Sequence, residues 1–423
     1  MINQLFKYIN ESPTAYHAVK NATDILEAEG FTRLDEGEDW ALEEGKGYYI
    51  TRSLSSLIAF RAHSGPFMIT AAHGDSPCFR IKQHPYIKKE GCITLNTERY
   101  GGMILSGWLD RPLSAAGQAL FRTADGITAK LFDIRREIAV IPSLAIHLNR
   151  EVNEGYKYNA QKDMLPLFSS DGEESGLNAL ICEACGEKES ALISCDAFLY
   201  NRQPACIFGK KGEFIGAPRL DDLESAYIAL RSFIDAAPAE NTPVYCLFDN
   251  EEVGSGTRQG ADSSFLWDTL SRLKGNYSQK LASGMLISID NAHAFHPNYP
   301  EKYDPADRVF LNGGVALKHS ANRKYTTDAL SDALFSEIAK KAGARVQHFS
   351  NRSDVPGGST LGSISGTHVS ICSADIGFPQ LAMHSAFETA GVSDVEDMSK
   401  AVKAFYQTVL IRKTDGQYCI MSR

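Results

Sequence analysis

The sequence predicts an α/β fold, an open mixed sheet flanked by helices, with a second and mainly β domain inserted into it. Two observations predict this arrangement. Short apolar runs that suit buried strands end in turns carrying His, Asp or Glu at residues 67–77, 243–252 and 284–293, and a further apolar run occupies 368–377. Helical patterns alternate with these runs. Such alternation is typical of an open α/β sheet, whose ligand sites lie beyond the strand ends.

Two of the expected helices are well marked. Behind the acidic start "LDD", apolar residues recur at helical spacing, and an acidic first turn suits a helix N-terminus. These apolar residues are Leu223, Ala226, Tyr227, Leu230 and Phe233. Residues 326–343 follow the same pattern, and Gly343 is expected to end that helix.

The stretch between residues 85 and 205 has a different character. It consists of short β-like runs separated by glycines and polar turns, and it contains no strand followed by an acidic turn. We therefore expect a discontinuous α/β domain of residues 1–84 and 206–423, with an inserted β-rich domain of residues 85–205.

Composition excludes several classes of protein. The 423 residues are 43% hydrophobic, which suits a globular protein of two or three domains, and the formal net charge is −9. This charge argues against nucleic acid or an anionic membrane as the main partner. No apolar stretch is long enough to cross a bilayer, and the first residues do not resemble a signal peptide.

The cysteines indicate a reducing compartment. There are nine, an odd number scattered through the chain, so we expect reduced thiols and a cytoplasmic location. Cys182 and Cys185 have the spacing of a redox or zinc pair, but no second pair lies nearby in the sequence. We interpret them as two free thiols.

The polar residues at the predicted strand ends form a possible metal centre. Taken singly, each has an ordinary explanation, such as a helix cap or a turn. Together, two His and three carboxylates can hold two zinc-like ions if one carboxylate bridges them. The set comprises His73, Asp75, Asp221, Glu251, Glu252, Asp290 and His384.

The adjacent glutamates are explained by such a centre. Glu252 can ligate a cation, while Glu251 can point toward the reacting water and act as a general base. Asp75, in the H-x-D sequence, suits a role in holding the His73 ring by its other nitrogen.

Several motifs resemble those of the aspartyl aminopeptidase family of cocatalytic zinc metallopeptidases. They match in order and spacing almost from end to end, and they read "SPTAYHAV", "AAHGDSP", "PRLDDL", "FDNEEVGS", "DNAHAFHPNY" and "PQLAMHS". The segments "YGGMILSGWLDRPL" and "IPSLAIHLNREVNEG" resemble the family's inserted dimerisation domain. The fold that this resemblance implies is a zinc-peptidase-like catalytic domain carrying that insert.

The resemblance also implies roles for individual residues. Its metal ligands are His73, Asp221 (bridging), Glu252, Asp290 and His384, with Glu251 as the general base. Its substrate-binding residues are His293, Lys318, Tyr325 and Gly358, together with His147, which would enter the active site of a neighbouring subunit. It implies homodimers that assemble into a tetrahedral dodecamer.

The expected activity is removal of N-terminal residues from peptides with a free N-terminus, with a preference for Asp or Glu. The expected cofactors are two divalent ions per subunit, Zn by preference, although the ligand types also suit Mn or Co. Three residues depart from the family pattern: Asp222 replaces an Asn, Asn291 replaces an apolar residue, and Gly357 replaces a Cys. Asp222 adds negative charge, which bears on the preferred metal and substrate.

Three other interpretations of the sequence stay open. One is a two-metal aminopeptidase that prefers neutral N-terminal residues. Another is a related two-metal carboxypeptidase or deacylase, which would recognise a free carboxylate instead of a free amine. The third is a noncatalytic shell protein, which the retention of Glu251 and of every ligand disfavours.

Overall fold

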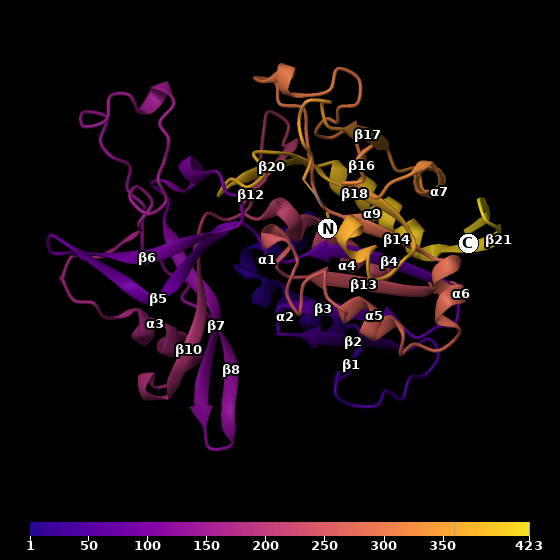
Figure 1. The fold of residues 1–423 in the computed structure, drawn as a ribbon, viewed down its shortest axis with the longest axis horizontal. Coiled ribbons are helices and arrows are strands. Elements are labelled where there is room, and N and C mark those ends of the chain that lie inside the picture. The colour runs from indigo at the N-terminus through magenta and orange to yellow at the C-terminus, as the bar shows by residue number, and fades with distance from the viewer. Residues whose placement is uncertain (359, 423) are drawn as a thin grey trace. The chain divides into compact units, whose positions relative to one another are not determined.

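The computed structural model describes residues 1–358 and 360–422, which form two compact units (Figure 1). The first unit comprises Met1–Asp75, Ala205–Met383 and Glu388–Arg423, of which Arg423 is not described, and the second comprises Ser76–Pro204 and His384–Phe387. The second unit begins at Ser76, before the boundary at residue 85 that the sequence indicated. The reason is that β5 (Cys78–Lys89) pairs with β6 (Cys92–Tyr100) and β10 (Leu192–Asn201) inside the second unit.

The first unit is built on a nine-stranded sheet, and the α/β mixed-sheet fold predicted from the sequence is confirmed. In spatial order its strands are β1 (Thr32–Arg33), β2 (Gly47–Arg52), β3 (Ser56–Arg61), β13 (Thr242–Phe248), β4 (Phe67–His73), β14 (Met285–Ile289), β18 (Cys372–Gly377), β16 (Val315–His319) and β17 (Val346–Ser350). The four central strands β13, β4, β14 and β18 are parallel. Antiparallel pairs flank them on both sides, which makes the sheet mixed.

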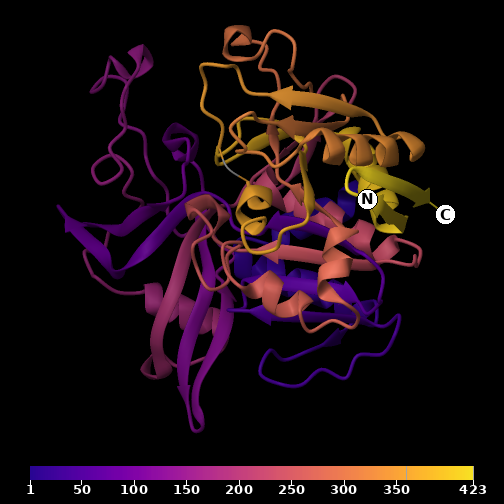
Figure 2. The ribbon, with the colours of Figure 1, turned by 45° about the vertical axis from the view of Figure 1, so that its right-hand side comes forward.

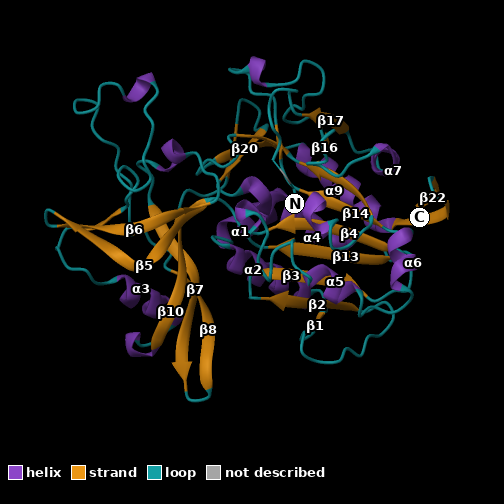
Figure 3. Cartoon of the chain, viewed as in Figure 1, coloured by secondary structure: helices purple, strands orange, loops and turns teal. Residues whose placement is uncertain are grey.

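Helices cover both faces of this sheet, as Figures 2 and 3 show from two directions. One face packs against α1 (Ile2–Glu11), α2 (Ala15–Ala28), α4 (Leu220–Asp235), α7 (Ala329–Lys341) and α9 (Asp394–Gln407). The other face packs against α5 (Phe265–Leu270), α6 (Tyr277–Ala282) and α8 (Leu361–Ser365). Burial on both faces explains why the central strands appear in the sequence as continuous apolar runs.

Strand β13 shows how the two layers divide one sequence. Tyr245 and Leu247 belong to the core on the α4 face, whereas Cys246 and Phe248 belong to the core on the α5 face. Alternate side chains of a strand point to opposite faces, so every residue of this strand is buried. The strand therefore ends at a fixed position, and the polar residues after Phe248 emerge at a defined point on the sheet edge.

Smaller elements complete the first unit. A five-stranded sheet contains β11 (Cys206–Phe208), β12 (Phe214–Ala217), β20 (Glu388–Gly391), β19 (Pro379–Leu381) and β15 (Ala292–His293). A hairpin of β21 (Thr408–Thr414) and β22 (Gln417–Ser422) follows α9. Asp328 is the N-cap of helix α7 and forms a capping box with Ser331, and Gly343 follows the end of the helix with a φ of +69°.

The second unit is mainly β. Its six-stranded antiparallel sheet has the order β8 (Gly126–Asp133), β7 (Leu113–Thr123), β10 (Leu192–Asn201), β5, β6 (Cys92–Tyr100) and β9 (Leu167–Ser169). Helix α3 (Leu177–Cys185) packs against it through Leu177, Ile181 and Cys182. Cys182 and Cys185 carry no disulfide, and burial raises the pKa of both thiols, which keeps them protonated.

The connection between β8 and β9 carries an exposed apolar segment. Leu144, Ile146 and Leu148 are 58%, 47% and 76% exposed, and His147 lies between them with its side chain exposed.

Among the residues that the structure describes, no helix combines the length and the apolar character needed to cross a bilayer.

Candidate metal centre

The carboxyl ends of three neighbouring parallel strands bring polar residues together. His73 is the last residue of β4, Asp290 directly follows β14, and Glu251 and Glu252 lie in a short 3₁₀ turn after β13. Strand β4 lies between β13 and β14 in the sheet. Because parallel strands end at the same edge, residues far apart in the sequence become neighbours here.

Helix α4 supplies two further carboxylates of the first unit. Asp221 and Asp222 stand at its start with non-helical backbone angles, and both are buried. Asp221 Oδ1 lies 3.3 Å from His73 Nε2. One set of possible ligand atoms, all within 4.8 Å of one another, belongs to His73, Asp221, Asp222 and Asp290, and a second belongs to His73, Glu251 and Glu252.

The arrangement suits cations because negative charge dominates it. Burial, together with the charges of Asp290, Asp75 and Asp221, raises the pKa of Glu251 to about 8 against the opposing effect of His73. Burial also raises the pKa of Asp290, with Asp221 contributing, although Lys318 and His73 oppose the shift. Carboxylates so close together cannot all be ionised unless cations compensate their charge; otherwise some of them stay protonated. The donor set, imidazole and carboxylate, is one that zinc accepts.

The His73 ring is oriented by its own loop. Nδ1 lies 3.0 Å from the backbone carbonyl oxygen of Asp75 and 3.4 Å from its carboxylate. A carbonyl can only accept, so Nδ1 donates and Nε2 faces Asp221. Burial lowers the pKa of His73, but the neighbouring carboxylates, Asp221 first, outweigh this and raise it well above its usual value. A metal ion would displace the Nε2 proton, since only a neutral imidazole binds metal.

The Asp75 carboxylate has a second function that the sequence did not suggest. Its two oxygens accept hydrogen bonds from the backbone N–H groups of Glu251 and Glu252, each at 3.1 Å. Asn250, just before the pair, has a φ of +63°, a conformation that Asn tolerates better than most residues. Asp75 thus fixes the turn that carries the glutamate pair, as well as lying beside the imidazole.

His384 lies on the connection between β19 and β20, and His384–Phe387 groups with the second unit. Its Nδ1 lies 2.7 Å from the carbonyl oxygen of Gly102, so Nδ1 donates this hydrogen bond. The same tautomer argument as for His73 applies, and Nε2 is the nitrogen suited to a metal ion.

The predicted substrate-binding residues of the first unit lie around Phe349. His293 and Tyr325 have ring centroids 6.4 and 6.3 Å from that of Phe349. Lys318 is only 2% exposed and its Nζ lies 5.0 Å from the Tyr325 ring centroid. The Lys318 ammonium donates to the carbonyl oxygens of Asp290 and Asn291, at 2.7 and 3.2 Å.

Two other predicted positions have simpler surroundings. Gly358 is exposed, and a Cβ built on it would meet no atom within 4 Å. At the neighbouring Gly357 a Cβ would lie 2.6 Å from Nδ2 of Asn351. The Asn351 side chain thus occupies the space that a larger residue at position 357 would need. His147 belongs to the second unit, where its side chain is exposed.

Two buried acids that the sequence analysis did not assign also shape the centre. Glu388, 2% exposed, accepts a hydrogen bond from the backbone N–H of Asp221 at 3.1 Å. Asp222 accepts one from the backbone N–H of His73 at 3.2 Å. Glu388 lies only four residues after His384 in "HSAFE", and a carboxylate so close to a candidate ligand was the available signal.

Comparison with known proteins identifies relatives over the full chain. The family model described as "Aminopeptidase I zinc metalloprotease (M18)" matches residues 8–406. A protein of Clostridium novyi named "Probable M18 family aminopeptidase 2" is 42% identical, over 96% of this chain and 98% of its own length. The family indicated by the sequence motifs is confirmed at the level of the M18 aminopeptidases.

Solved structures agree with this family. The structure titled "Cryo-EM structure of the Ape4 and Nbr1 complex" superposes with a TM-score of 0.92 at 32% identity, over 95% of this chain and 84% of that chain. The "Structure of S. cerevesiae mApe1 dodecamer" superposes with a TM-score of 0.82 at 26% identity, over 96% and 95% of the two chains.

The contact between Asp222 and His73 predicts a difference between two variants. Asp222→Asn keeps an oxygen that can accept from the His73 N–H, so the metal-free protein should retain its free energy of unfolding within about 1 kcal/mol. Asp222→Ala leaves that buried N–H unpaired and should cost about 1–3 kcal/mol. Urea unfolding of the chelated protein, followed by near-ultraviolet circular dichroism, measures both. Equal destabilisation by the two substitutions would contradict the assigned contact.

Proposed function

Because the chain belongs to the M18 family of aminopeptidases, which are zinc metalloproteases, we propose that the centre holds two divalent ions and that the enzyme cleaves the N-terminal residue from peptides. The observation that carries the proposal is the group of His73, Asp221 and Asp290 at one sheet edge, with the Glu251–Glu252 turn beside it. When bound, the ions supply Lewis-acid polarisation of the scissile carbonyl and make water a better nucleophile near neutral pH.

We assign the ligands in two sets that share Asp221. His73, Asp221 and Asp290 form the first set, supported by their clustered ligand atoms. Asp221, Glu252 and His384 form the second. The support for His384 is its hydrogen bond to Gly102, which presents Nε2, and its position between two strands of the unit that carries the other ligands. Sharing one carboxylate leaves coordination positions for the reactants. The ligand types favour Zn and also suit Mn or Co.

We assign the proton transfers to Glu251. Its neighbour Glu252 is occupied as a ligand, and Asp75 holds the backbone of both, so Glu251 is left to face the reacting atoms. It takes a proton from the attacking water and returns it to the amine that leaves. Opposite charge favours the ionised form of a carboxylate, so bound cations would lower the pKa of Glu251 from its raised value. The base would then be ionised at neutral pH.

We further propose a preference for peptides that begin with Asp or Glu. An ammonium group has three donors, and the bonds from Lys318 to the carbonyls of Asp290 and Asn291 use two of them. The third can pair with a carboxylate of the substrate. Family membership favours an aminopeptidase over a carboxypeptidase or deacylase. A preference for neutral N-terminal residues is the alternative within the same class.

We propose that dimers form through the second unit and assemble into a tetrahedral dodecamer. The support is the exposed apolar segment around His147, since exposed apolar patches mark interaction surfaces. One structural relative is named as a dodecamer. In this assembly His147 would serve the active site of a neighbouring subunit. None of the nine cysteines forms a disulfide, which supports a reducing compartment such as the cytoplasm.

The glutamate pair tests the mechanism. Glu251→Gln should retain both ions and lose about 100- to 10,000-fold in kcat, the usual contribution of a general base. Glu252→Gln should lose an ion, because an amide is a poorer ligand than a carboxylate. Metal content by mass spectrometry and kcat on an aspartyl peptide are measured together. Depletion of metal in Glu251→Gln, with full loading of Glu252→Gln, would reverse the two roles.

Lys318 tests the substrate preference. A charge-assisted hydrogen bond in a dry pocket contributes about 1.5–3 kcal/mol, or roughly ten- to a hundredfold in selectivity. Lys318→Met should therefore remove that margin between aspartyl and leucyl peptides in kcat/KM, at unchanged metal content.

Lys280 provides a matched control for Lys318. It is also buried, and it also donates to two backbone carbonyls, those of His63 and Lys274. Lys280→Met should leave the preference intact. Faster cleavage of leucyl than of aspartyl peptides by the unmodified enzyme would refute the acidic preference without affecting the assignment as an aminopeptidase.

Sharing of the active site is tested by mixing inactive subunits. Glu251→Gln and His147→Phe subunits should each be inactive alone, and mixed dimers should regain part of the activity, because some sites then combine an intact Glu251 with an intact His147. Native mass spectrometry confirms that the subunits have mixed. Mixed dimers without any recovered activity would show that His147 does not serve a neighbouring site.

A further inference from the structure

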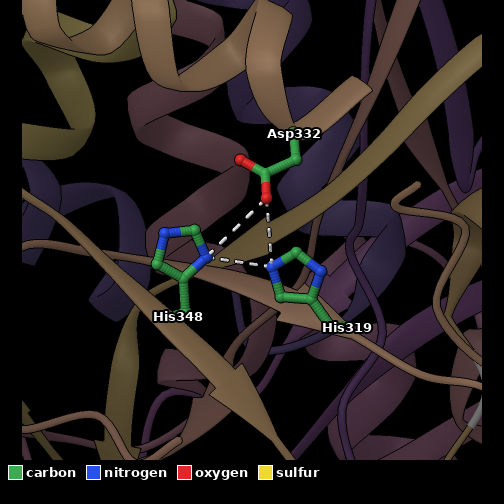
Figure 4. A group of neighbouring side chains, drawn as sticks. All are labelled: His319, Asp332 and His348. Atoms are coloured by element: carbon green, nitrogen blue, oxygen red, sulfur yellow. Dashed lines mark hydrogen bonds and ion pairs between the residues drawn. The ribbon is translucent and has the colours of Figure 1, made fainter. Parts of the chain in front are cut away.

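A second group of metal-ligating side chains lies in the first unit, apart from the residues of the candidate metal centre. His319 ends β16, His348 is part of β17 and Asp332 belongs to α7 (Figure 4). His319 Nε2 and His348 Nδ1 lie 3.0 Å apart. Asp332 Oδ2 lies 3.7 Å from His319 Nε2 and 3.9 Å from His348 Nδ1.

The fold directs the three side chains to one place. Strands β16 and β17 are parallel, and Leu317 is the register partner of His348. Leu317 packs in the core with residues of α7, so His319, two positions further on, and His348 face α7 as well. Asp332 lies near the start of that helix. Convergence thus follows from the packing of regular elements and not from a loop.

The separations match those of ligands around a single ion. Bonds of about 2.0–2.1 Å in tetrahedral geometry place neighbouring ligand atoms about 3.3 Å apart. The separations of 3.0, 3.7 and 3.9 Å lie on both sides of that value. Small rotations of the three side chains would bring all of them into coordination.

The hydrogen bond between the two imidazoles explains only part of the arrangement. One neutral ring can donate to the other at 3.0 Å without any ion. At 3.7 and 3.9 Å, however, the Asp332 oxygen is too far from either nitrogen for a hydrogen bond. The other oxygen, Oδ1, accepts from Ser336 Oγ at 2.9 Å, which holds Oδ2 toward the rings. A cation between the three atoms would satisfy Oδ2 and both nitrogens.

The surroundings allow an ion to enter and bind. The side chains of His319 and Asp332 are 29% and 28% exposed, and that of His348 is 52% exposed. A surface depression lined in part by His319, Asp328 and Asp332 opens beside them.

We propose that His319, Asp332 and His348 form a third metal site that binds a divalent transition-metal ion of the zinc class. Two imidazoles and one carboxylate suit Zn²⁺ better than Ca²⁺ or Mg²⁺, because those two ions prefer oxygen ligands. The bound ion links α7 to the end of β16 and the middle of β17. Lys318 precedes His319 on β16 and faces the other side, where it holds Asp290. The ion therefore braces the strand that supports the candidate metal centre, without contacting reactants.

Counting ions in matched variants tests the proposal. Chelated protein is dialysed against micromolar Zn²⁺, and bound zinc per chain is measured by mass spectrometry. His348→Gln and Asp332→Asn should each bind one zinc fewer than the unmodified protein, whatever number the candidate metal centre holds. His368→Gln is the control, because His368 pairs with the single carboxylate of Asp262 at 2.8 Å and should leave the count unchanged.

Two further measurements separate this site from the catalytic one. The zinc-dependent increase in melting temperature should be smaller in His348→Gln and Asp332→Asn than in the control, while peptidase activity at saturating zinc persists in all three variants. An unchanged zinc count in both variants would overturn the proposal. Loss of the ion together with loss of activity would also overturn it, because the missing ion would then be a catalytic one.

Discussion

The structure depends on one electrostatic constraint, the burial of several carboxylates around a single imidazole at one edge of the sheet. Asp221, Asp222 and Asp290 share this space with His73, and the Glu251–Glu252 pair lies next to it. Burial and mutual repulsion raise the pKa of Asp222, Glu251 and Asp290. A folded state that binds more protons than the unfolded chain loses stability as the pH rises. Without bound cations, the clustered carboxylates therefore reduce the stability of the folded protein.

The surrounding backbone limits this cost and keeps the geometry in place. Glu388 and Asp222 each accept a hydrogen bond from the backbone N–H of a candidate ligand. Asp75 accepts two, from the backbone N–H groups of the glutamate pair. Lys318 is the one buried ammonium in contact with Asp290 in the described part of the chain. Hydrogen bonds to charged groups are stronger than neutral ones. The same contacts that offset the charge therefore also fix the ligand positions before any ion binds.

The sequence was sufficient to predict the features set by local pattern. Continuous apolar runs followed by His73, Glu251 or Asp290 indicated buried strands with polar ends, and the mixed sheet follows this pattern. It was insufficient where the decisive contact is non-local. The carboxylate of Asp75 accepts hydrogen bonds from the backbone N–H groups of Glu251 and Glu252, which lie 176 and 177 residues away. The identity of the two glutamate side chains gives no sign of these backbone contacts.

The lysine and the third site show the same limit. Lys318 lies in a polar stretch that gave no sign of its 2% exposure, because the carbonyls that bind it belong to the distant segment that follows β14. His319, Asp332 and His348 are separated by 13 and 16 residues, so no compact motif announces them. The boundary near residue 85 was misplaced for the related reason that the sequence of β5 does not show with which strands it pairs. Its partners, β6 and β10, assign it.

The two groups of ligands place opposite demands on the protein. In the candidate metal centre several carboxylates are buried together. A cation there would be attracted by all of them and would reduce the repulsion between them. In the third site one carboxylate faces two imidazoles near the surface, so there is little charge repulsion, and the two imidazoles can hydrogen-bond each other without an ion. An ion in the centre is thus coupled to chemistry and to folding, whereas an ion at the third site adds stability to an edge of the sheet that can form without it.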